Sequence, residues 1–269
     1  MREENHLTDL SADRIRGWLP EELRGAPVVV FPVLESSNRT CKQLALEGAP
    51  HGTVVLADAQ TAGRGRLGRS FFSPAGTGLY FSLLLRSEEA PEKILQVTSL
   101  AAVAVCRAIA SVTGLECEIK WVNDIYLRGR KLCGILAEGI VDPNRGQLSG
   151  VVLGIGINCG NRREDFPEEL QEIVTSLWME TGEVPDRSRL AAELYRCLLE
   201  ILAPGEILPG MEEYRRRSCV LDKEVRFFRG EDTWEGRAEA ITAEGHLIVR
   251  LDSGERVELS TGEISVRVK

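Results

Sequence analysis

The chain has 269 residues, of which 43% are hydrophobic and 28% charged, a balance typical of a soluble globular protein with one large domain or two unequal ones. Lysine and arginine number 33 against 41 aspartates and glutamates, and the resulting net charge of −8 argues against general nucleic-acid binding. Residues 1–25 lack the apolar core of a signal peptide, and we find no apolar span of 18 residues, so we expect no membrane segment.

Hydrophobic periodicity in the first part of the chain predicts alternating strands and helices. The expected elements are a helix at Ser11–Leu19, a strand at Val28–Val33, a helix at Asn38–Glu47 whose start Ser36 or Ser37 could cap, strands at Thr53–Asp58 and Leu79–Leu85, and a helix at Pro91–Val112 stopped by Gly114.

The second part of the chain changes from strands to helices and then to short strands. We expect a strand at Glu118–Leu127, a turn at Arg128–Gly129, strands at Lys131–Val141 and Gln147–Ile157, helices at Pro167–Glu180, Arg187–Leu202 and Glu206–Ser218, and strands at Glu224–Phe228, Trp234–Ile241, His246–Leu251 and Arg256–Leu259. This pattern predicts an N-terminal extension over 1–25, an α+β domain over 26–220 and a small barrel-like domain over 221–269.

Residues 60–71, QTAGRGRLGRSF, combine three glycines with three arginines and predict an anion-binding loop. The stretch also satisfies the dinucleotide pattern G-x-G-x-x-G through Gly63, Gly65 and Gly68. That pattern requires a helix to begin at its third glycine, whereas Pro74 and Gly76 follow closely, so we reject a dinucleotide site.

Three further motifs follow in order: KWVNDIYL at 120–127, RKLCGILAE at 130–138 and GIGIN at 154–158. Together with GRGRLGR, at these spacings, they resemble the biotin–protein ligases. The resemblance covers residues 35–158 with four motifs, and residues 221–268 are similar to the terminal domain of that family.

The resemblance implies a class II synthetase-like catalytic domain with a mixed or antiparallel sheet and flanking helices, followed by an SH3-like β-barrel. It implies ATP and biotin as substrates, Mg²⁺ as the accompanying ion, biotinyl-5′-AMP as intermediate, and the lysine of a biotin carboxyl carrier domain as acceptor. We expect a short form without the DNA-binding domain that some members carry, hence a ligase that does not repress transcription, with no membrane partner and a homodimer as one possible assembly. Seven scattered cysteines without C-x-x-C spacing favour reduced thiols in the cytoplasm.

Joining a carboxylate to the α-phosphate of ATP brings two anions together, so cations must flank both groups. We assign this catalytic role to Arg66 and Lys131. By resemblance, the biotin-binding residues are Ser36, Ser37, Asn38, Gln60, Gly63, Arg64, Lys131 and Gly134. The residues expected to bind ATP or the adenylate are Arg64, Arg66, Arg69, Phe71, Lys120, Asn123 and Asn158. Asp124 is the candidate metal ligand, and its alternative role is a hydrogen-bonding residue at a strand end.

Other functions stay open at this point. A lipoate or octanoate ligase or transferase would share the fold and act on another acyl group. A non-enzymatic biotin sensor would bind the same ligand without transferring it. A nucleotide-dependent oxidoreductase would need the helix after Gly68 that the sequence argues against.

Overall fold

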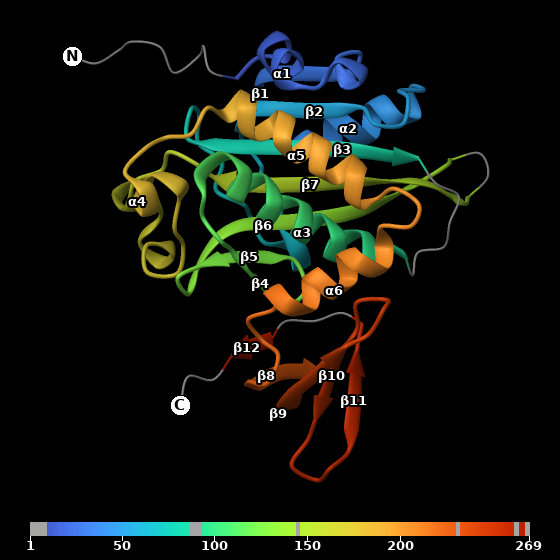
Figure 1. Ribbon diagram of the computed structural model, residues 1–269, viewed down its shortest axis with the longest axis vertical. Coiled ribbons are helices and arrows are strands. Elements are labelled where there is room, and N and C mark those ends of the chain that lie inside the picture. The colour runs from blue at the N-terminus through green and yellow to red at the C-terminus, as the bar shows by residue number, and fades with distance from the viewer. Residues whose placement is uncertain (1–9, 87–92, 144–145, 230–231, 261–263, 267–269) are drawn as a thin grey trace.

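Two separate β-sheets organise the chain, as Figure 1 shows. The computed structural model describes residues 10–86, 93–143, 146–229, 232–260 and 264–266. The larger sheet has seven strands: β1 (Val28–Leu34), β2 (Val54–Gln60), β3 (Gly78–Arg86), β4 (Glu118–Lys120), β5 (Asp124–Leu127), β6 (Arg130–Val141) and β7 (Leu148–Asn158). The α-helices are α1 (Ala12–Trp18), α2 (Ser37–Leu46), α3 (Lys93–Thr113), α4 (Leu177–Thr181), α5 (Arg187–Ile201) and α6 (Ile207–Arg217).

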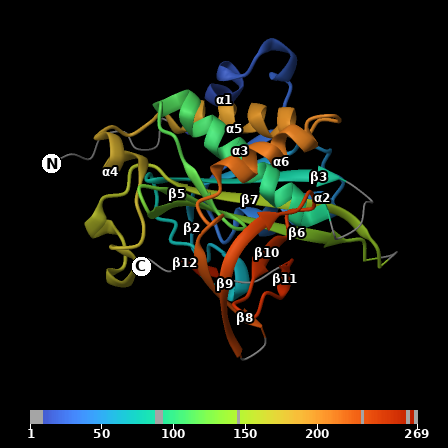
Figure 2. The ribbon, with the colours of Figure 1, turned by 60° about the horizontal axis from the view of Figure 1, so that its bottom comes forward.

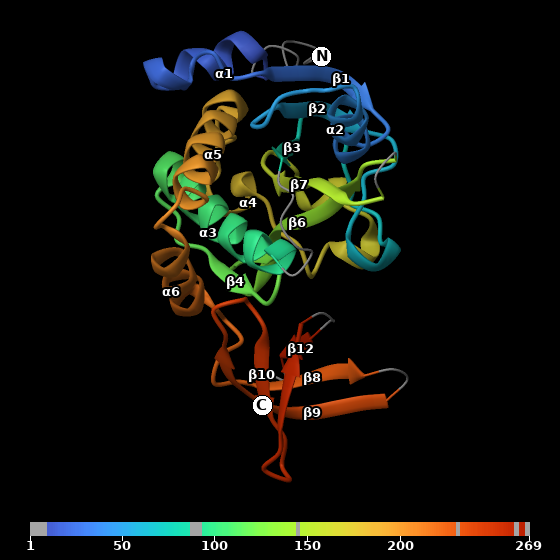
Figure 3. The same ribbon diagram turned by 90° about the vertical axis from the view of Figure 1, so that its right-hand side faces the viewer.

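The larger sheet is mixed, in the order β1-β2-β3-β7-β6-β5-β4. Strands β1 and β2 are parallel, and every other neighbouring pair is antiparallel. Helices α3 and α5 cover one face of the sheet and α2 covers the other (Figure 3). The expectation of a mixed sheet with flanking helices is therefore confirmed.

Helix α3 forms the centre of the hydrophobic core, and its residues from Leu100 to Cys106 are 0–1% exposed. The segment Ile94–Thr113 is long and apolar enough to cross a membrane by length and composition, which corrects our expectation that no such span exists. Because 61% of this segment is buried inside the molecule, it has the surroundings of a core helix. Pro91, expected in the first turn, lies outside the described residues.

The segment before β1 packs against the domain that follows. Ile15 and Leu19 are almost fully buried in the main core. The backbone N–H of Ser11 donates to Ser188 Oγ at 3.1 Å, and Arg14 pairs with Asp186 at 2.6 Å. The predicted helix is present with Ser11 as its N-cap, so the described part of the extension contributes to the core.

Two expected elements are wrong. Residues 118–127 do not form one strand, because β4 and β5 pair antiparallel around the connection 121–123, with Lys120 opposite Asp124. Residues 167–180 do not form one helix. They contain only a short 3₁₀ turn at Glu168–Leu170 and the start of helix α4. Between these two pieces the backbone forms hydrogen bonds with β6: Lys131 N donates to Ile173 O, and Thr175 N donates to Lys131 O. A long-range pairing thus replaces the local helical bonds.

The smaller sheet is antiparallel in the order β11-β10-β9-β8-β12 and comes toward the viewer in Figure 2. It contains β8 (Glu224–Arg229), β9 (Asp232–Ile241), β10 (Leu247–Arg250), β11 (Arg256–Leu259) and β12 (Ile264–Val266). Among the described residues no pairing joins β11 to β12, so we describe it as an SH3-like sheet, not as a closed barrel. The boundary drawn at 220 and 221 falls between α6 and β8 and stays a prediction.

The turn between β9 and β10 contacts the larger domain. Trp121 Nε1 donates to Gly245 O at 2.9 Å, and Gln96 Nε2 donates to Ala243 O at 2.9 Å. Trp121 is 4% exposed, as expected for a core residue. The C-terminal domain therefore holds the connection between β4 and β5 through the Trp121 hydrogen bond.

Candidate active site

A cavity of about 540 Å³ lies on the larger sheet, between the loop 60–71 and the segment 166–174. Its wall includes every predicted site residue except Gly63: Ser36, Ser37, Asn38, Gln60, Arg64, Arg66, Arg69, Phe71, Lys120, Asn123, Asp124, Lys131, Gly134 and Asn158. Gly63 instead lies where two chain segments meet, since an added Cβ would stand 2.4 Å from Phe71 O. Residues from five strands (β2, β4, β5, β6 and β7), from the start of α2 and from the connecting loops thus meet around one cavity, while their individual roles stay predictions.

One end of the cavity is a buried polar network. Ser37 N donates to Gln60 Oε1 at 2.8 Å, and Gln60 Nε2 donates to Ser73 Oγ at 3.0 Å. Ser82 Oγ lies 2.8 Å from Ser37 Oγ and 2.7 Å from Asn38 Oδ1. Ser36 is the N-cap residue of α2, one of the two positions expected, but its side chain makes no capping hydrogen bond. These fixed donors and acceptors can recognise a polar ring of a ligand through hydrogen bonds.

Glu138 extends this network and was missed by sequence reasoning. Its carboxylate accepts from Asn38 Nδ2 at 2.8 Å and from Lys42 Nζ at 2.9 Å, and Arg64 lies 3.7 Å away. Burial acts to raise the pKa of Glu138, but the hydrogen bonds from Asn38 and Lys42 outweigh it and lower the pKa. Strand alternation could have found this residue, since it lies four positions after Gly134 on the same strand.

Glycines form the floor of the cavity where β6 and β7 run side by side. Gly134 pairs with Gly156, and an added Cβ on Gly156 would lie 2.6 Å from the Phe71 ring. An added Cβ on Gly154 would lie 2.2 Å from Asn38 Oδ1. Phe71 also packs edge-on against Tyr80, with ring centroids 6.4 Å apart. The floor is therefore shaped for close approach of an aromatic ring and an amide.

Cationic groups gather at the other end. Lys131 Nζ lies 2.6 Å from Asp124 Oδ1, and Arg66 Nη1 donates to Asn123 Oδ1 at 3.0 Å. Asn123 is fixed in turn, because its Nδ2 donates to Ile135 O at 2.7 Å. Lys120 Nζ lies over the Tyr126 ring at 5.2 Å. Two cations held by polar partners can flank a pair of anions.

Asp124 is the predicted metal ligand, and its Oδ1 is taken by the Lys131 ammonium. Within the described ranges, no three His, Cys, Asp or Glu side chains gather as a metal cluster would require. A single carboxylate still fits Mg²⁺, which is commonly held by one or two carboxylates plus substrate phosphates. The residues present therefore suit an ion that arrives with a nucleotide.

Cys133 and Cys159 are fully buried, as expected for small core residues. Burial raises the pKa of the Cys133 thiol well above its ordinary value. A protonated buried thiol is a poor nucleophile, so the site offers no thiolate for covalent chemistry at this position.

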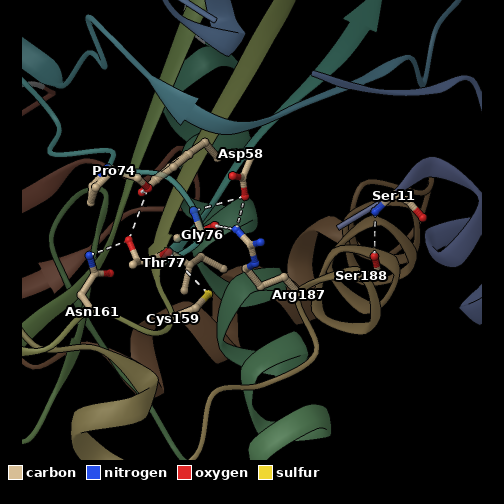
Figure 4. A network of polar contacts seen from close by, with 12 residues as sticks. Ser11, Asp58, Pro74, Gly76, Thr77, Cys159, Asn161, Arg187 and Ser188 are labelled. Carbon is tan, nitrogen blue, oxygen red and sulfur yellow. Dashed lines mark hydrogen bonds and ion pairs between the residues drawn. The ribbon is translucent and has the colours of Figure 1, made fainter. Parts of the chain in front are cut away.

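A network of polar contacts joins α5 to the ends of neighbouring strands, as Figure 4 shows. Arg187 Nη1 donates to Asp58 Oδ1 at 2.7 Å and to Gly78 O at 3.1 Å. Thr77 O accepts from Cys159 N at 2.9 Å, and Asn161 Nδ2 donates to Thr77 Oγ1 at 2.9 Å. These contacts join the ends of β2 and β7, which carry the site residues Gln60 and Asn158.

The segment after β7 forms one wall of the cavity. Phe166, Leu170 and Ile173 line it, and the Phe166 ring packs against Phe72 with centroids 5.8 Å apart. Asn158 Nδ2 donates to Thr175 O at 2.9 Å and anchors the segment. Sequence reasoning missed this wall because it predicted a helix there.

Comparison with known proteins agrees with these features. The model of the biotin/lipoate A/B protein ligase family matches residues 30–158, and that of the biotin protein ligase C terminal domain matches residues 220–267. The bifunctional ligase/repressor BirA of Bacillus subtilis is 42% identical over 249 residues, which are 91% of this chain and 76% of that protein. The biotin–[acetyl-CoA-carboxylase] ligase of Mycobacterium tuberculosis is 35% identical over 237 residues, 85% of each chain.

Among solved structures, the biotin protein ligase from Aquifex aeolicus in complex with biotin and ATP superposes with a TM-score of 0.77 at 28% identity. The match covers 90% of this chain and 99% of that one. Similarity of sequence and of fold thus extends over both domains, and the chain belongs to the biotin protein ligase family.

Proposed function

We propose that this protein is an ATP-dependent biotin–protein ligase that forms biotinyl-5′-AMP and then transfers biotin to a lysine of a biotin carboxyl carrier domain. The observation that carries the proposal is one cavity with a buried polar network at one end and the cations Arg66 and Lys131 at the other. The family relatives and the fold support the same activity.

The polar end suits the ureido ring of biotin. The network of Ser37, Asn38 and Gln60 offers donors and acceptors, and the glycine floor lets Asn38 and the Phe71 ring lie close to the sheet. A lipoyl or octanoyl group has no hydrogen-bonding groups at that position. Because it would shield these polar groups from water without offering them a further hydrogen bond, the network should discriminate against both acyl groups.

The cationic end suits the reacting anions. A carboxylate oxygen of biotin attacks the α-phosphorus of ATP, a P–O bond forms, and the bond to pyrophosphate breaks. Lys131 and Arg66 would hold the two anions together and stabilise charge as it builds on the phosphate. In the second step the carrier lysine amine attacks the acyl carbon, the acyl–phosphate C–O bond breaks, and AMP leaves as the amine loses a proton.

Magnesium would supply neutralisation of the pyrophosphate oxygens. Asp124 is the residue we propose near that ion, with Asn123 as a further oxygen donor. Lys120, Arg64, Arg69, Phe71 and Asn158 are proposed to bind the nucleotide part, as their place on the cavity wall supports.

We further propose a cytoplasmic location and a homodimer. All seven cysteines are free and all but Cys219 are buried, which supports a reducing compartment. Strand β1 ends the larger sheet and exposes Val33 to 55%, so a second copy could pair along this edge. Sedimentation of the purified protein over a concentration series tests the dimer. The charge of −8 supports the absence of nucleic-acid binding, which DNA titration at low salt tests.

The activity is tested by transfer of labelled biotin to a purified carrier domain, with ATP and magnesium present or omitted. We expect labelling that needs ATP and resists an excess of lipoate or octanoate. Labelling that lipoate suppresses would assign the site to another acyl group. Binding of biotin without any labelling of several carriers would favour the sensor. Arg66→Ala should release the adenylate faster or slow its formation, and wild-type behaviour would remove Arg66 from the mechanism.

A further inference from the structure

Glu180 is a buried carboxylate in α4 with partners on both oxygens. Its side chain is 1% exposed. Arg130 Nη2 lies 2.7 Å from Oε1, Arg128 Nη1 lies 3.1 Å from Oε2, and Thr175 Oγ1 donates to Oε1 at 2.6 Å. A buried charge is stable only when paired and hydrogen-bonded, and this one has three donors.

The cluster joins two parts of the chain that are far apart in sequence. Arg128 and Arg130 belong to the hairpin between β5 and β6, immediately before Lys131. Thr175 and Glu180 come directly after the segment 166–174 that walls the cavity, and Glu180 lies in α4. The carboxylate therefore fixes this segment to the start of the strand that carries the predicted catalytic lysine.

Thr175 links the cluster to two site residues. Its backbone N–H donates to Lys131 O at 2.8 Å, and its carbonyl accepts from Asn158 Nδ2 at 2.9 Å. Lys131 N also donates to Ile173 O at 2.9 Å. A shift of Thr175 would therefore move the Lys131 backbone and the Asn158 amide together.

The hairpin turn adds a second observation. Arg128 has φ +49° and Gly129 has φ +76°, as the two central residues of a type I′ turn require. Glycine, asparagine or aspartate is the usual residue at the first of these positions, because a positive φ strains other side chains. The ion pair with Glu180 gives a reason for arginine at this position.

We propose that Glu180 is a positioning residue for the ligase reaction, which fixes Lys131 and Asn158 through Thr175 so that the lysine ammonium is aligned for adenylate formation. The proposal rests on the proposed function. Glu180 does not line the cavity and acts through the 173–175 segment. Its removal should therefore affect the rate of activation more than the affinity for biotin.

The test is the single-turnover rate of adenylate formation in Glu180→Gln at saturating ATP and biotin, together with the biotin dissociation constant. Glutamine keeps the shape but removes the charge and directs an NH₂ group toward an arginine. A displacement of about 1 Å at the reacting centre reduces rates on the order of 100-fold. We expect a loss of roughly 10- to 100-fold in the rate, with the dissociation constant changed by less than about threefold.

The matched control is Glu213→Gln. Glu213 is also a shielded carboxylate between two arginines, with Arg107 at 2.7 Å and Arg217 at 2.8 Å, and its side chain is 12% exposed. It lies on α6, away from the cavity wall. We expect Glu213→Gln to lower the urea midpoint of unfolding but to keep the wild-type rate of adenylate formation.

A second variant covers the case in which Glu180→Gln does not fold. Thr175→Val removes the hydroxyl that donates to Glu180 but keeps both backbone bonds, and should slow adenylate formation, whereas Thr175→Ser should restore it. Wild-type rates in Glu180→Gln or Thr175→Val overturn the proposal, as do equal rate losses in Glu180→Gln and Glu213→Gln. Absence of adenylate from the wild-type protein would instead refute the proposed function.

Discussion

Replacing Asp58 by Asn should destabilise the protein strongly, because it removes a carboxylate paired with a buried arginine. Arg187 is 1% exposed and its Nη1 lies 2.7 Å from Asp58 Oδ1, while the Asp58 side chain is 11% exposed. The same oxygen accepts from Gly76 N at 3.3 Å. Asparagine retains an oxygen for these donors, so the variant changes the charge and little else.

The size of the effect follows from this burial. Removing one partner of a buried ion pair costs about 3–5 kcal/mol, since the other charge is left in a low dielectric. We expect a loss of that order in the free energy of unfolding for Asp58→Asn and likewise for Arg187→Met. The double variant leaves neither charge behind, so its loss should fall short of the sum of the two by about 2 kcal/mol or more.

Urea unfolding followed by tryptophan fluorescence measures these differences, with one slope of the free energy of unfolding against urea concentration used for all variants. The control is Asp222→Asn, in an exposed pair with Arg237 at 3.3 Å, where side-chain exposures of 81% and 50% limit the expected effect to less than about 1 kcal/mol. The reasoning would be refuted if either single variant lost as little free energy of unfolding as the control. It would also be refuted if the loss in the double variant equalled the sum of the two single losses within about 0.5 kcal/mol.

Three further predictions concern the cavity and the polar network beside it. Gly154→Ala should lower biotin affinity by about 100-fold or more in calorimetry, because its Cβ would meet Asn38 Oδ1 at 2.2 Å, whereas Gly17→Ala, with nothing within 4 Å, should bind normally. Lys131→Ala should chiefly impair adenylate formation in single-turnover assays, and wild-type rates would remove it from the mechanism. The lowered pKa of Glu138 means that its ionised form stabilises the fold fully above the ordinary pKa of 4.5, and that this contribution is lost as the pH falls through the lowered pKa. The stability difference between wild type and Glu138→Gln should therefore be constant above about pH 5 and shrink in more acidic urea titrations.

The strands of the larger sheet could be predicted because their patterns are local. Runs such as 54–57 and 151–153 are apolar and rich in β-branched residues, and the structure places β2 and β7 there. The stop of α3 at Gly114, with φ +73°, follows equally from local backbone preference. Element type is well determined where the local preference and the burial agree.

The two wrong elements show what local reasoning lacks. Residues 167–180 have helix-forming glutamates and spaced apolar residues, but the backbone of 173–175 bonds to Lys131 some 40 positions earlier. Trp121 and Val122 favour a strand, yet they form a turn in which Trp121 Nε1 reaches Gly245 in the other domain. In both places a contact distant in sequence determines the conformation.

The same distinction applies to the site residues. Some site residues belong to short motifs whose residue types indicate anion binding: Gly63, Arg64, Arg66 and Lys131. Glu138 and Ser82 belong to no such motif. Their role in the polar network depends on hydrogen bonds to residues of α2 about 100 and 45 positions away. Only the folded structure, which brings Asn38 and Lys42 beside Glu138, identifies Glu138 as part of the site.

The contacts divide the cavity into a fixed part and a part that can move at little cost. The polar network around Gln60 is buried and held by hydrogen bonds of 2.7–3.1 Å, so moving it would leave buried groups unpaired. Arg64, by contrast, is 62% exposed and lies 3.7 Å from Glu138, and an exposed pair of this kind contributes only about 0–1 kcal/mol. Leu67, at φ +54° and 68% exposed, forms the tip of the same loop. Acyl-group selection should therefore depend on the rigid network, while the exposed Arg64 side chain can turn toward an anion at little cost, so variants in the network and at Arg64 should change specificity and rate separately.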